Sequence, residues 1–191
     1  EPIGGYSTTL DGPFDQTYST PGNYKVSYSV MDAITMCETS FDQYVRIFNE
    51  PSANFLASDI CDGEEMHFEN TSSLTVINGD NITLYEWDFD YDGITFNKDL
   101  LFDNQTIFDR NIGATGSYIV ALRVTTSEGC QNLIQKTVEV HPMPIATFGL
   151  DQSQGCSILP IQFTNTSVLA QPANVSNYFW EIDYNDGAGY I

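Results

Sequence analysis

The chain has 191 residues, of which 41% are hydrophobic and 13% aromatic, so it contains enough apolar side chains for one large core or two small ones. Its 26 acidic and 6 basic residues give a net charge of -20, which repels phosphate backbones and anionic lipid surfaces. We therefore expect no nucleic-acid partner and no direct membrane insertion by this segment, and divalent cations are its natural counter-ions. No apolar run reaches the length of a transmembrane helix, and we expect any export signal to lie outside these residues.

Strand patterns dominate the chain from its first third onward. Tyrosine and valine alternate with lysine and serine over residues 22–30, and apolar residues alternate in the same way over residues 116–124. A period of two places one face of a strand in a core and the other face outside. No stretch keeps a helical period, and "STPGN" and "TSEGC" have the composition of turns. The sequence predicts an all-β protein built from antiparallel immunoglobulin-like β-sandwiches.

Internal repeats define the organisation of the chain. "YEWDFDYDG", which begins at Tyr85, recurs as "YFWEIDYNDG" from Tyr178, at an offset of 93 residues, and the same offset relates Cys37 to Cys130. "GNYKVSYSV" recurs as "GSYIVALRV", and "FENTS" recurs as "FTNTS". The repeats predict a tandem array in which residues 1–50 are the C-terminal half of one unit, 51–143 a complete unit, and 144–191 the N-terminal half of the next. The short proline-containing joints "FNEPSANF" and "HPMPIATF" predict that the units form a semi-rigid rod.

These motifs resemble those of the polycystic-kidney-disease (PKD) domain. Its signature is a W-D-F-G-D-G strand end followed by a strand of the pattern aromatic-x-x-x-G-x-Y-x-V-x-L-x-V, and the similarity covers the whole chain. Tandem copies with a G-C turn and a second cysteine early in the next unit look most like those of giant cell-surface proteins of gliding Bacteroidota, including gliding-motility adhesins. The resemblance implies a PKD-like sandwich, a core tryptophan, and an exported protein located outside the cell or on its surface.

The sequence departs from the family signature at residues 87–93, which read W-D-F-D-Y-D-G and are one residue longer. Asp88, Asp90 and Asp92 then alternate before a glycine, like the opening of an EF-hand loop, with Asp99 at the twelfth position in place of the closing glutamate. We predict that these acids approach the joint with the next unit and bind calcium there; the alternative is an acidic turn that is merely solvated. The candidate ligands in the third unit are Glu181, Asp183, Asn185 and Asp186.

The cysteines fall at two repeated places, the turn between the last two strands and the loop after the first strand. They are Cys37, Cys61, Cys130 and Cys156. No C-x-x-C pair is present, so disulfides in an exported protein explain them better than zinc does. In an immunoglobulin-like sandwich Cys61 and Cys130 would lie at opposite ends of one unit, and we expect each to bond with a neighbouring unit.

Other residues carry competing structural and functional interpretations. Trp87 and Trp180 could stack on sugars, but their alternation with other aromatics and the family resemblance favour a core position. His67 and His141 are expected to be surface polar residues. Five N-x-S/T sequons occur, and two of them belong to the repeated F-x-N-T-S motif, so we assign them no role. No catalytic motif of serine, cysteine or zinc hydrolases appears, and we expect no enzymatic activity.

The resulting functional prediction is a non-catalytic stalk segment of a large exported cell-surface adhesin or filament, with a role in adhesion or gliding motility. Its expected partners are neighbouring repeats of the same chain, surface glycans or other cell-surface proteins, and its expected ion is calcium. Two alternatives stay open: a polysaccharide-binding accessory module of a secreted hydrolase, and a protein-binding repeat of an ectodomain.

Overall fold

The computed structural model describes residues 12–13, 15–77, 79–169, 177–180 and 182. Within these residues the chain is all-β, and its single helical element is a 3₁₀ turn, η1. The elements in chain order are β1 (Gly22–Met31), β2 (Glu38–Ile47), β3 (Phe55–Ala57), β4 (Ile60–Cys61), β5 (Met66–Asn70), β6 (Ile82–Asp88), η1 (Leu100–Phe102), β7 (Ile107–Arg110), β8 (Gly116–Thr126), β9 (Gln131–His141), β10 (Phe148–Leu150) and β11 (Phe163–Asn165).

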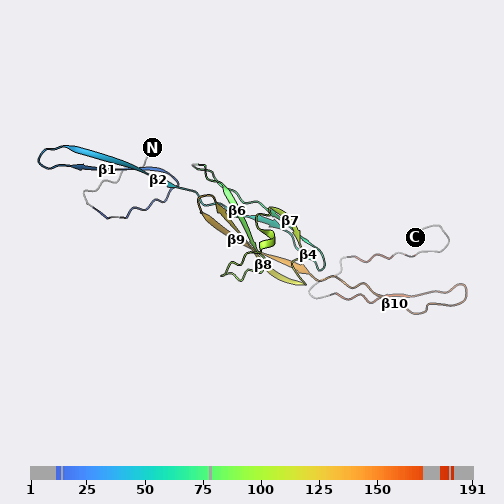
Figure 1. Ribbon diagram of the computed structural model, residues 1–191. Coiled ribbons are helices and arrows are strands. Elements are labelled where there is room, and N and C mark those ends of the chain that lie inside the picture. Colours follow the sequence, from blue (N-terminus) through green and yellow to red (C-terminus); the bar gives the residue numbers. More distant parts are fainter. Residues whose placement is uncertain (1–11, 14, 78, 170–176, 181, 183–191) are drawn as a thin grey trace.

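Strands β3 to β9 form a two-sheet sandwich, which we call the middle unit. One sheet has the strand order β3-β5-β7 and the other β4-β9-β8-β6. The two sheets face each other in the centre of Figure 1. Neighbouring strands are antiparallel, except that the short strand β4 runs parallel to β9. After β3 the chain thus crosses from the first sheet to the second, which joins the two layers at the end where β9 finishes.

Period-two alternation produces the core of the middle unit. On β8 the side chains of Val120, Leu122 and Val124 are fully buried, and Trp87 on the neighbouring strand β6 is fully buried too. The ring of Trp87 lies 5.2 Å from the Phe55 ring, centroid to centroid, in an edge-on arrangement. Such contacts stabilise a core beyond the area they bury. The prediction that Trp87 is a core residue is confirmed, whereas Trp180, for which a core position was also favoured, is 46% exposed in the described part of the chain.

A buried indole also needs a hydrogen-bond acceptor. The Trp87 Nε1–H donates to the backbone carbonyl of Gln105 at 3.0 Å. The segment that returns from β6 toward β7 therefore supplies the acceptor, which ties this long loop to the core.

Two hairpins flank the middle unit, β1–β2 on one side and β10–β11 on the other (Figure 1). The β1–β2 hairpin pairs its strands from Gly22 opposite Ile47 onward, and β8–β9 does so from Gly116 opposite Val140. The two hairpins therefore pair equivalent residues, at an offset of 94 residues between the first strands (116 - 22) and 93 between the second (140 - 47).

The tyrosines near the start of β1 and β8 make the same contact. Tyr24 donates its hydroxyl to the carbonyl of Thr20 at 2.6 Å, and Tyr118 donates to Ala114 at 2.7 Å. Each bond reaches four residues upstream, as in the tyrosine corner of immunoglobulin-like sandwiches.

The F-x-N-T-S motif repeats its hydrogen bonds as well as its letters. Asn70 accepts from the amide of Ser72 at 2.9 Å, and the Ser72 hydroxyl donates to the carbonyl of Asn54 at 3.1 Å. In the third unit Asn165 and Ser167 make the equivalent bonds at 2.9 and 3.2 Å, the latter to Thr147. The motif thus has a structural role. It holds the residue before β3 or β10 against the segment that follows β5 or β11.

Candidate functional site

The acidic segment after Trp87 lies at the end of β6 and in the loop that follows it. Asp88 is 2% exposed, and both of its carboxylate oxygens accept backbone hydrogen bonds. Its Oδ1 accepts from the amide of Asp90 at 3.1 Å, and its Oδ2 accepts from the amide of Asn97 at 2.6 Å. The Asp88 side chain therefore fixes both ends of the loop 89–97, and neither of its carboxylate oxygens is left without a hydrogen bond.

Glu86 lies two residues earlier on the same face of β6 and is also buried, 4% exposed. Its carboxylate pairs with Arg123 on β8, at 2.7 Å to Nη2, and with Lys98 of the loop, at 3.1 Å to Nζ. Lys98 contacts Asp103 as well, at 2.9 Å. Two cations therefore compensate this buried charge, as a carboxylate removed from water requires.

Asp92 forms a tight turn with the residues after it. Its Oδ1 accepts from the amides of Ile94 at 2.8 Å and Thr95 at 2.7 Å. Gly93, which follows Asp92 directly, has φ +86°, a conformation that glycine adopts without strain. Hydrogen bonds from the Thr95 and Ile94 amides lower the pKa of the Asp92 carboxyl below its ordinary value.

The same pair of side-chain hydrogen bonds occurs far from this site, between β1 and β2, although Ala33 there does not share the positive φ of Gly93. Asp32 accepts from the amides of Ile34 at 2.9 Å and Thr35 at 2.7 Å, in the sequence D-A-I-T, where Asp92 has D-G-I-T. A local side-chain-to-backbone turn of this kind is therefore sufficient to explain the position of Asp92.

Asp99 begins the 3₁₀ turn η1 and faces a cation. It accepts from the amide of Leu101 at 3.0 Å and forms an ion pair with Arg110 of β7. Burial raises the pKa of the Asp99 carboxyl, but the hydrogen bonds from Arg110 and Leu101 outweigh burial and leave the pKa lowered. The Arg110 guanidinium also lies over the ring of Phe89, 4.0 Å from its centroid.

A shallow polar cavity of about 350 Å³ lies between these groups. Asp88, Asp90 and Asp99 line it together with the positively charged side chains of Lys98 and Arg110. Asp92 is not among the lining residues. The structure thus brings three of the four acids predicted for calcium to one cavity and leaves the fourth in its own turn.

Cations lie closer to these acids than the net charge of -20 suggests, because three of the chain's six basic residues, Lys98, Arg110 and Arg123, lie around β6 and its loop. β6 runs toward the end where β9 finishes, and the segment after it continues along β8 in that direction, since the Tyr91 amide donates to the Ile119 carbonyl at 3.3 Å. The loop then turns back beside β6, where the Asp99 amide donates to the Trp87 carbonyl at 2.7 Å. The approach of the acids to the joint with the next unit stays a prediction. Calcium binding itself stays a prediction. Glu181, Asp183, Asn185 and Asp186 of the third unit lie outside the described residues.

The four cysteines all have free thiols. Cys61 pairs in register with His141 at the end of β9, and Cys130 lies in the turn before Gln131 at the start of β9. Strand β9 has 11 residues, so at about 3.4 Å per residue these cysteines are separated by far more than the Cα spacing of a disulfide. Disulfides to neighbouring units stay a prediction.

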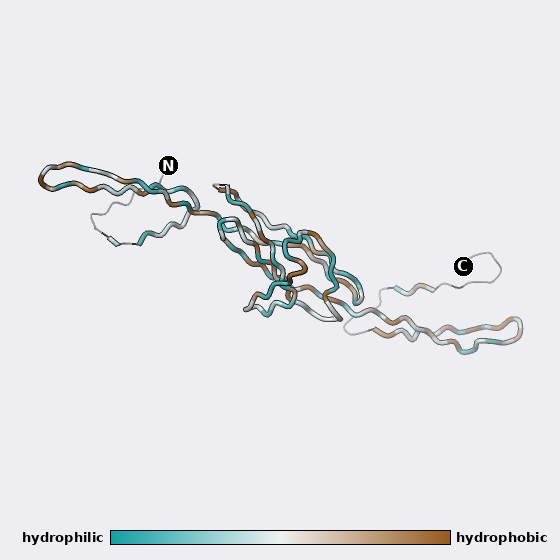
Figure 2. Tube along the Cα trace, in the orientation of Figure 1, coloured by the Kyte–Doolittle hydropathy of each residue, from teal (hydrophilic) through white to brown (hydrophobic). Residues whose placement is uncertain are grey.

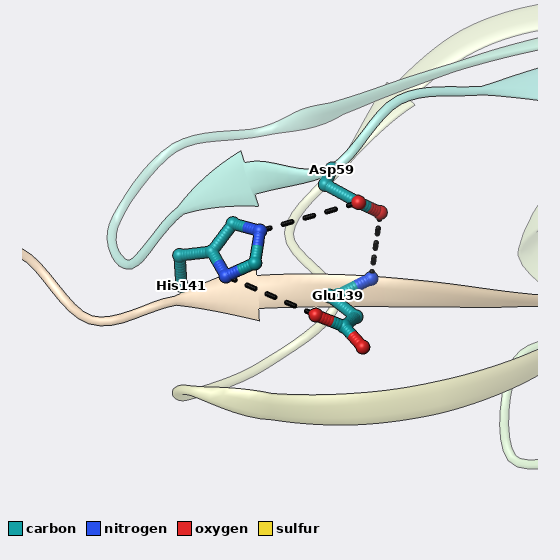
Figure 3. Close-up of side chains that lie close together, drawn as sticks. All are labelled: Asp59, Glu139 and His141. Carbon is teal, nitrogen blue, oxygen red and sulfur yellow. Dashed lines mark hydrogen bonds and ion pairs between the residues drawn. The ribbon is translucent and has the colours of Figure 1, made fainter. Parts of the chain in front are cut away.

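One cluster of titratable side chains lies at the end of the middle unit where β9 finishes, and it was missed in the sequence. Glu139 and His141 project from the same face of β9, and Asp59, from the turn before β4, accepts the Glu139 amide at 2.9 Å (Figure 3). The His141 Nε2 lies 4.0 Å from Asp59, and its Nδ1 lies 3.9 Å from Glu139. Among the described residues this is the one group of three whose candidate ligand atoms all lie within 4.8 Å of one another.

The orientation of the His141 ring decides what this cluster can do. Its two nitrogens face two different carboxylates, at 3.9 and 4.0 Å, which is beyond hydrogen-bond distance (Figure 3). All three residues are exposed, so water weakens any attraction between these groups. The signal in the sequence was the spacing of Glu139 and His141, i and i+2 on a strand; the contribution of Asp59 depends on the β4–β9 pairing, which the sequence did not reveal.

His67 makes an exposed hydrogen bond, in which its Nδ1 lies 2.6 Å from Oδ1 of Asp109 on the neighbouring strand β7. Both side chains are more than half exposed, so the prediction of a surface polar residue is confirmed for His67.

Within the described residues, no helix is both long and apolar enough to span a membrane.

The solved structures similar to this chain include two bacterial domains. The PKD1 domain of the metalloprotease PrtV from Vibrio cholerae has 28% sequence identity and a TM-score of 0.36, over 48% of this chain and 98% of that domain. The PKD1 domain of Epp from Vibrio anguillarum has 23% identity and a TM-score of 0.36, over 49% of this chain and 96% of that domain. No protein-family model and no curated protein matches the chain.

Proposed function

We propose that this chain is a non-catalytic segment of the extended stalk of a large exported adhesin on a cell surface, built from tandem PKD-like units of about ninety residues. In this proposal residues 51–143 are one complete unit, and residues 1–50 and 144–191 are halves of its two neighbours. The stalk carries an adhesive region away from the surface and contacts neighbouring repeats of its own chain.

The observation that carries the proposal is the repetition of geometry at the repeat offset. β1–β2 has the register of β8–β9, and β10–β11 has the register of β3–β5, from Phe148 opposite Asn165 as from Phe55 opposite Asn70. The first region therefore repeats the hairpin that ends the middle unit, the third region repeats the strand pair that begins it, and short proline-containing segments join the regions. Such an array extends with each added unit, which is what a stalk requires.

The aromatic residues of the middle unit support a structural role over carbohydrate binding. Trp87, Phe55 and Phe68 are fully buried, so they offer no stacking surface for sugars. The charged residues around β6 form ion pairs and backbone hydrogen bonds that hold the loop 89–103 in place. The buried aromatic residues and the charged residues around β6 therefore both stabilise the fold, which accounts for their positions without a ligand.

Antibody labelling of cells that produce the protein tests the location. An antibody against the middle unit should label intact cells, and brief protease treatment of those cells should remove the label, whereas an antibody against a cytoplasmic protein should label only permeabilised cells. Label that appears only after permeabilisation would contradict the proposal.

The polysaccharide-binding alternative gives a different result. An accessory module should be recovered in the culture medium on the same polypeptide as a hydrolase domain, and the purified chain should sediment with insoluble chitin or cellulose. A stalk segment should instead be recovered with the cells. In the binding assay, the purified chain should remain in the supernatant.

A further inference from the structure

The parallel contact between β4 and β9 places three side chains on the outer face of their sheet. Ile60 is paired with Val140, which is 2% exposed, and Ile60 itself packs against the core. Because side chains alternate along a strand, the residues before and after this pair project away from the core. They are Asp59 on one segment and Glu139 and His141 on the other, and all three are exposed. Hydrophobic and hydrophilic residues follow one another along the strands of the middle unit in the same way (Figure 2).

A backbone hydrogen bond holds the Asp59 carboxylate beside β9. Its Oδ1 accepts the amide of Glu139 at 2.9 Å, and its Oδ2 lies 4.0 Å from Nε2 of the His141 ring (Figure 3). Asp59 and Glu139 are 80 residues apart in the sequence. The fold therefore brings an imidazole and two carboxylates together from distant parts of the chain.

The spacing of these groups is close to that of the ligands of a zinc ion. One candidate ligand atom from each residue lies within 4.8 Å of the other two. The ligands of a tetrahedral zinc ion lie about 2.1 Å from the metal and hence about 3.4 Å from one another, so these atoms need to approach by roughly 1.4 Å at most. Exposed side chains make such movements by rotation about their own bonds, and Glu139 has the longest side chain of the three.

The cluster is not part of the repeated scaffold. At the repeat offset of 93 residues, Arg46 stands in the first region at the position of Glu139, and Gln152 stands in the third region at the position of Asp59. Trp87, by contrast, recurs as Trp180. A structural requirement shared by the units therefore does not account for the cluster, which is specific to the middle unit.

We propose that Asp59, Glu139 and His141 bind one zinc ion, with a water molecule as the fourth ligand. A site with an imidazole nitrogen suits zinc, whereas calcium and magnesium take oxygen ligands. The bound ion joins the segment before β4 to the end of β9, across the 80 residues that separate them in the sequence. It acts as a reversible cross-link that stabilises the middle unit when zinc is present.

The chain contains an internal control for this proposal. Its net charge of -20 attracts any cation to the whole surface, so binding alone does not identify a site. The second of its two histidines, His67, is exposed like His141 and contacts one acid, Asp109, at 2.6 Å. In the part of the chain that the structure describes, only the His141 cluster brings three candidate ligands together. General attraction acts on both histidines, whereas a zinc site acts on His141 alone.

The first test is a titration of the full chain with zinc chloride, followed by the NMR signals of the two histidine rings. Serine replaces every cysteine, so that no thiol takes the ion; these changes are Cys37→Ser, Cys61→Ser, Cys130→Ser and Cys156→Ser. The His141 signals should change and saturate at one zinc ion per chain, while the His67 signals stay in place. Magnesium chloride at the same concentrations should move neither ring. No change at His141, or equal changes at both histidines, would overturn the proposal.

The second test removes the ligands one at a time and measures zinc affinity by calorimetry. Asp59→Asn, Glu139→Gln and His141→Gln should each weaken binding at least about tenfold, since even groups that only orient metal ligands contribute that much. Asp109→Asn is the matched control and should leave the affinity unchanged. Asp59→Asn keeps an oxygen that can accept the Glu139 amide, so it removes the charge without removing this contact. An affinity that survives any one of the three ligand changes would overturn the three-residue site.

The third test measures thermal unfolding of the same proteins by circular dichroism. Zinc at a hundredfold excess over its Kd should raise the melting temperature by roughly 10 °C, because the ion binds the folded state. His141→Gln lies at an exposed position, so it should fold without zinc and lose this rise. The Asp109→Asn control should keep it. A rise of the same size in the ligand variants would show that zinc acts elsewhere on the chain and would overturn the proposal.

Discussion

The β8–β9 and β1–β2 hairpins have the same register and the same apolar alternation, yet Val124 is fully buried and Val30, at the equivalent position, is 45% exposed. Strand pairing depends on residues close in sequence, because a hairpin needs only its own turn and ladder. Burial depends on the opposite sheet, which comes from residues far away along the chain. A valine at the equivalent position is therefore a core residue in the β8–β9 hairpin and a surface residue in the β1–β2 hairpin.

The largest expected difference between the regions concerns the two tryptophans and the free energy of unfolding. Trp87→Ala should lower the free energy of unfolding by about 3–5 kcal/mol, because it removes a buried indole from the centre of the core. Trp180→Ala, at a 46% exposed position, should change that free energy by less than about 0.5 kcal/mol. Urea denaturation followed by circular dichroism measures both free energies. Similar losses for the two variants would contradict the difference in burial.

The repeated serines give a smaller effect of the same kind. Ser72→Ala removes the hydroxyl that donates to Asn54 O and accepts from Asn54 N–H, so it should destabilise the middle unit by about 1 kcal/mol. Ser167→Ala removes the same bonds to Thr147 in the third unit and should leave the main unfolding transition unchanged. The midpoint of urea denaturation provides the comparison, with Ser72→Thr as the variant that retains a hydroxyl. A main-transition shift caused by Ser167→Ala would mean that the third unit unfolds together with the middle unit.

The aspartate turns should behave alike in the two regions, because they need no opposite sheet. Backbone amides lower the pKa of Asp92, and the amide and hydroxyl of Thr35 with the amide of Ile34 lower the pKa of Asp32, both below the ordinary value of 3.8. Their contribution to stability is then fully present above an unfolded pKa of about 3.9 and is lost as the pH falls through the folded pKa.

Carboxyl chemical shifts in an acid titration should therefore give midpoints below 3.8 for both turns. Thr35→Val removes the hydroxyl that donates to Asp32 at 2.9 Å and should raise the Asp32 midpoint alone. Midpoints at or above the ordinary value would show that the turns open in solution.

Calcium should produce the smallest effect. Both oxygens of Asp88 accept backbone N–H groups, and Lys98 and Arg110 balance charge in the cavity, so binding must compete with contacts already present. We expect millimolar calcium to raise the melting temperature of the middle unit by a few degrees at most, corresponding to less than about 1 kcal/mol. Asp90→Ala should remove this rise, Asp32→Ala should not, and magnesium should do less than calcium. No shift at all, with no heat of binding in calorimetry, would identify the acids as structural residues alone.

The sequence predicted those parts of the fold that depend on local pattern. Alternation over residues 116–124 gave the buried face of β8, and the repeated motifs gave the strand elements shared by the three regions. The pairing of β4 with β9 was not predictable, because two residues carry no periodic signal. Burial of Glu86 was also missed, since its partner Arg123 lies 37 residues away on another strand. Similarly, Asp88 looked like a ligand because the backbone amides that satisfy it are supplied by a loop whose path the sequence did not specify.

The segment that leads from β3 into β4 is attached to β9 at several successive levels. Lys136 donates to the carbonyl of Phe55, the Glu139 amide donates to Asp59, and β4 pairs with β9 at Val140 and His141. Because β4 and β9 run parallel, tension applied to the two ends of the unit draws these strands in opposite directions along their common axis. The attachments then carry the load in shear and must yield together, whereas an antiparallel pair at the ends would open one bond after another. Under load the lifetime of such a unit is set by its unfolding rate, which makes this seam the part of the sandwich that determines how long it holds.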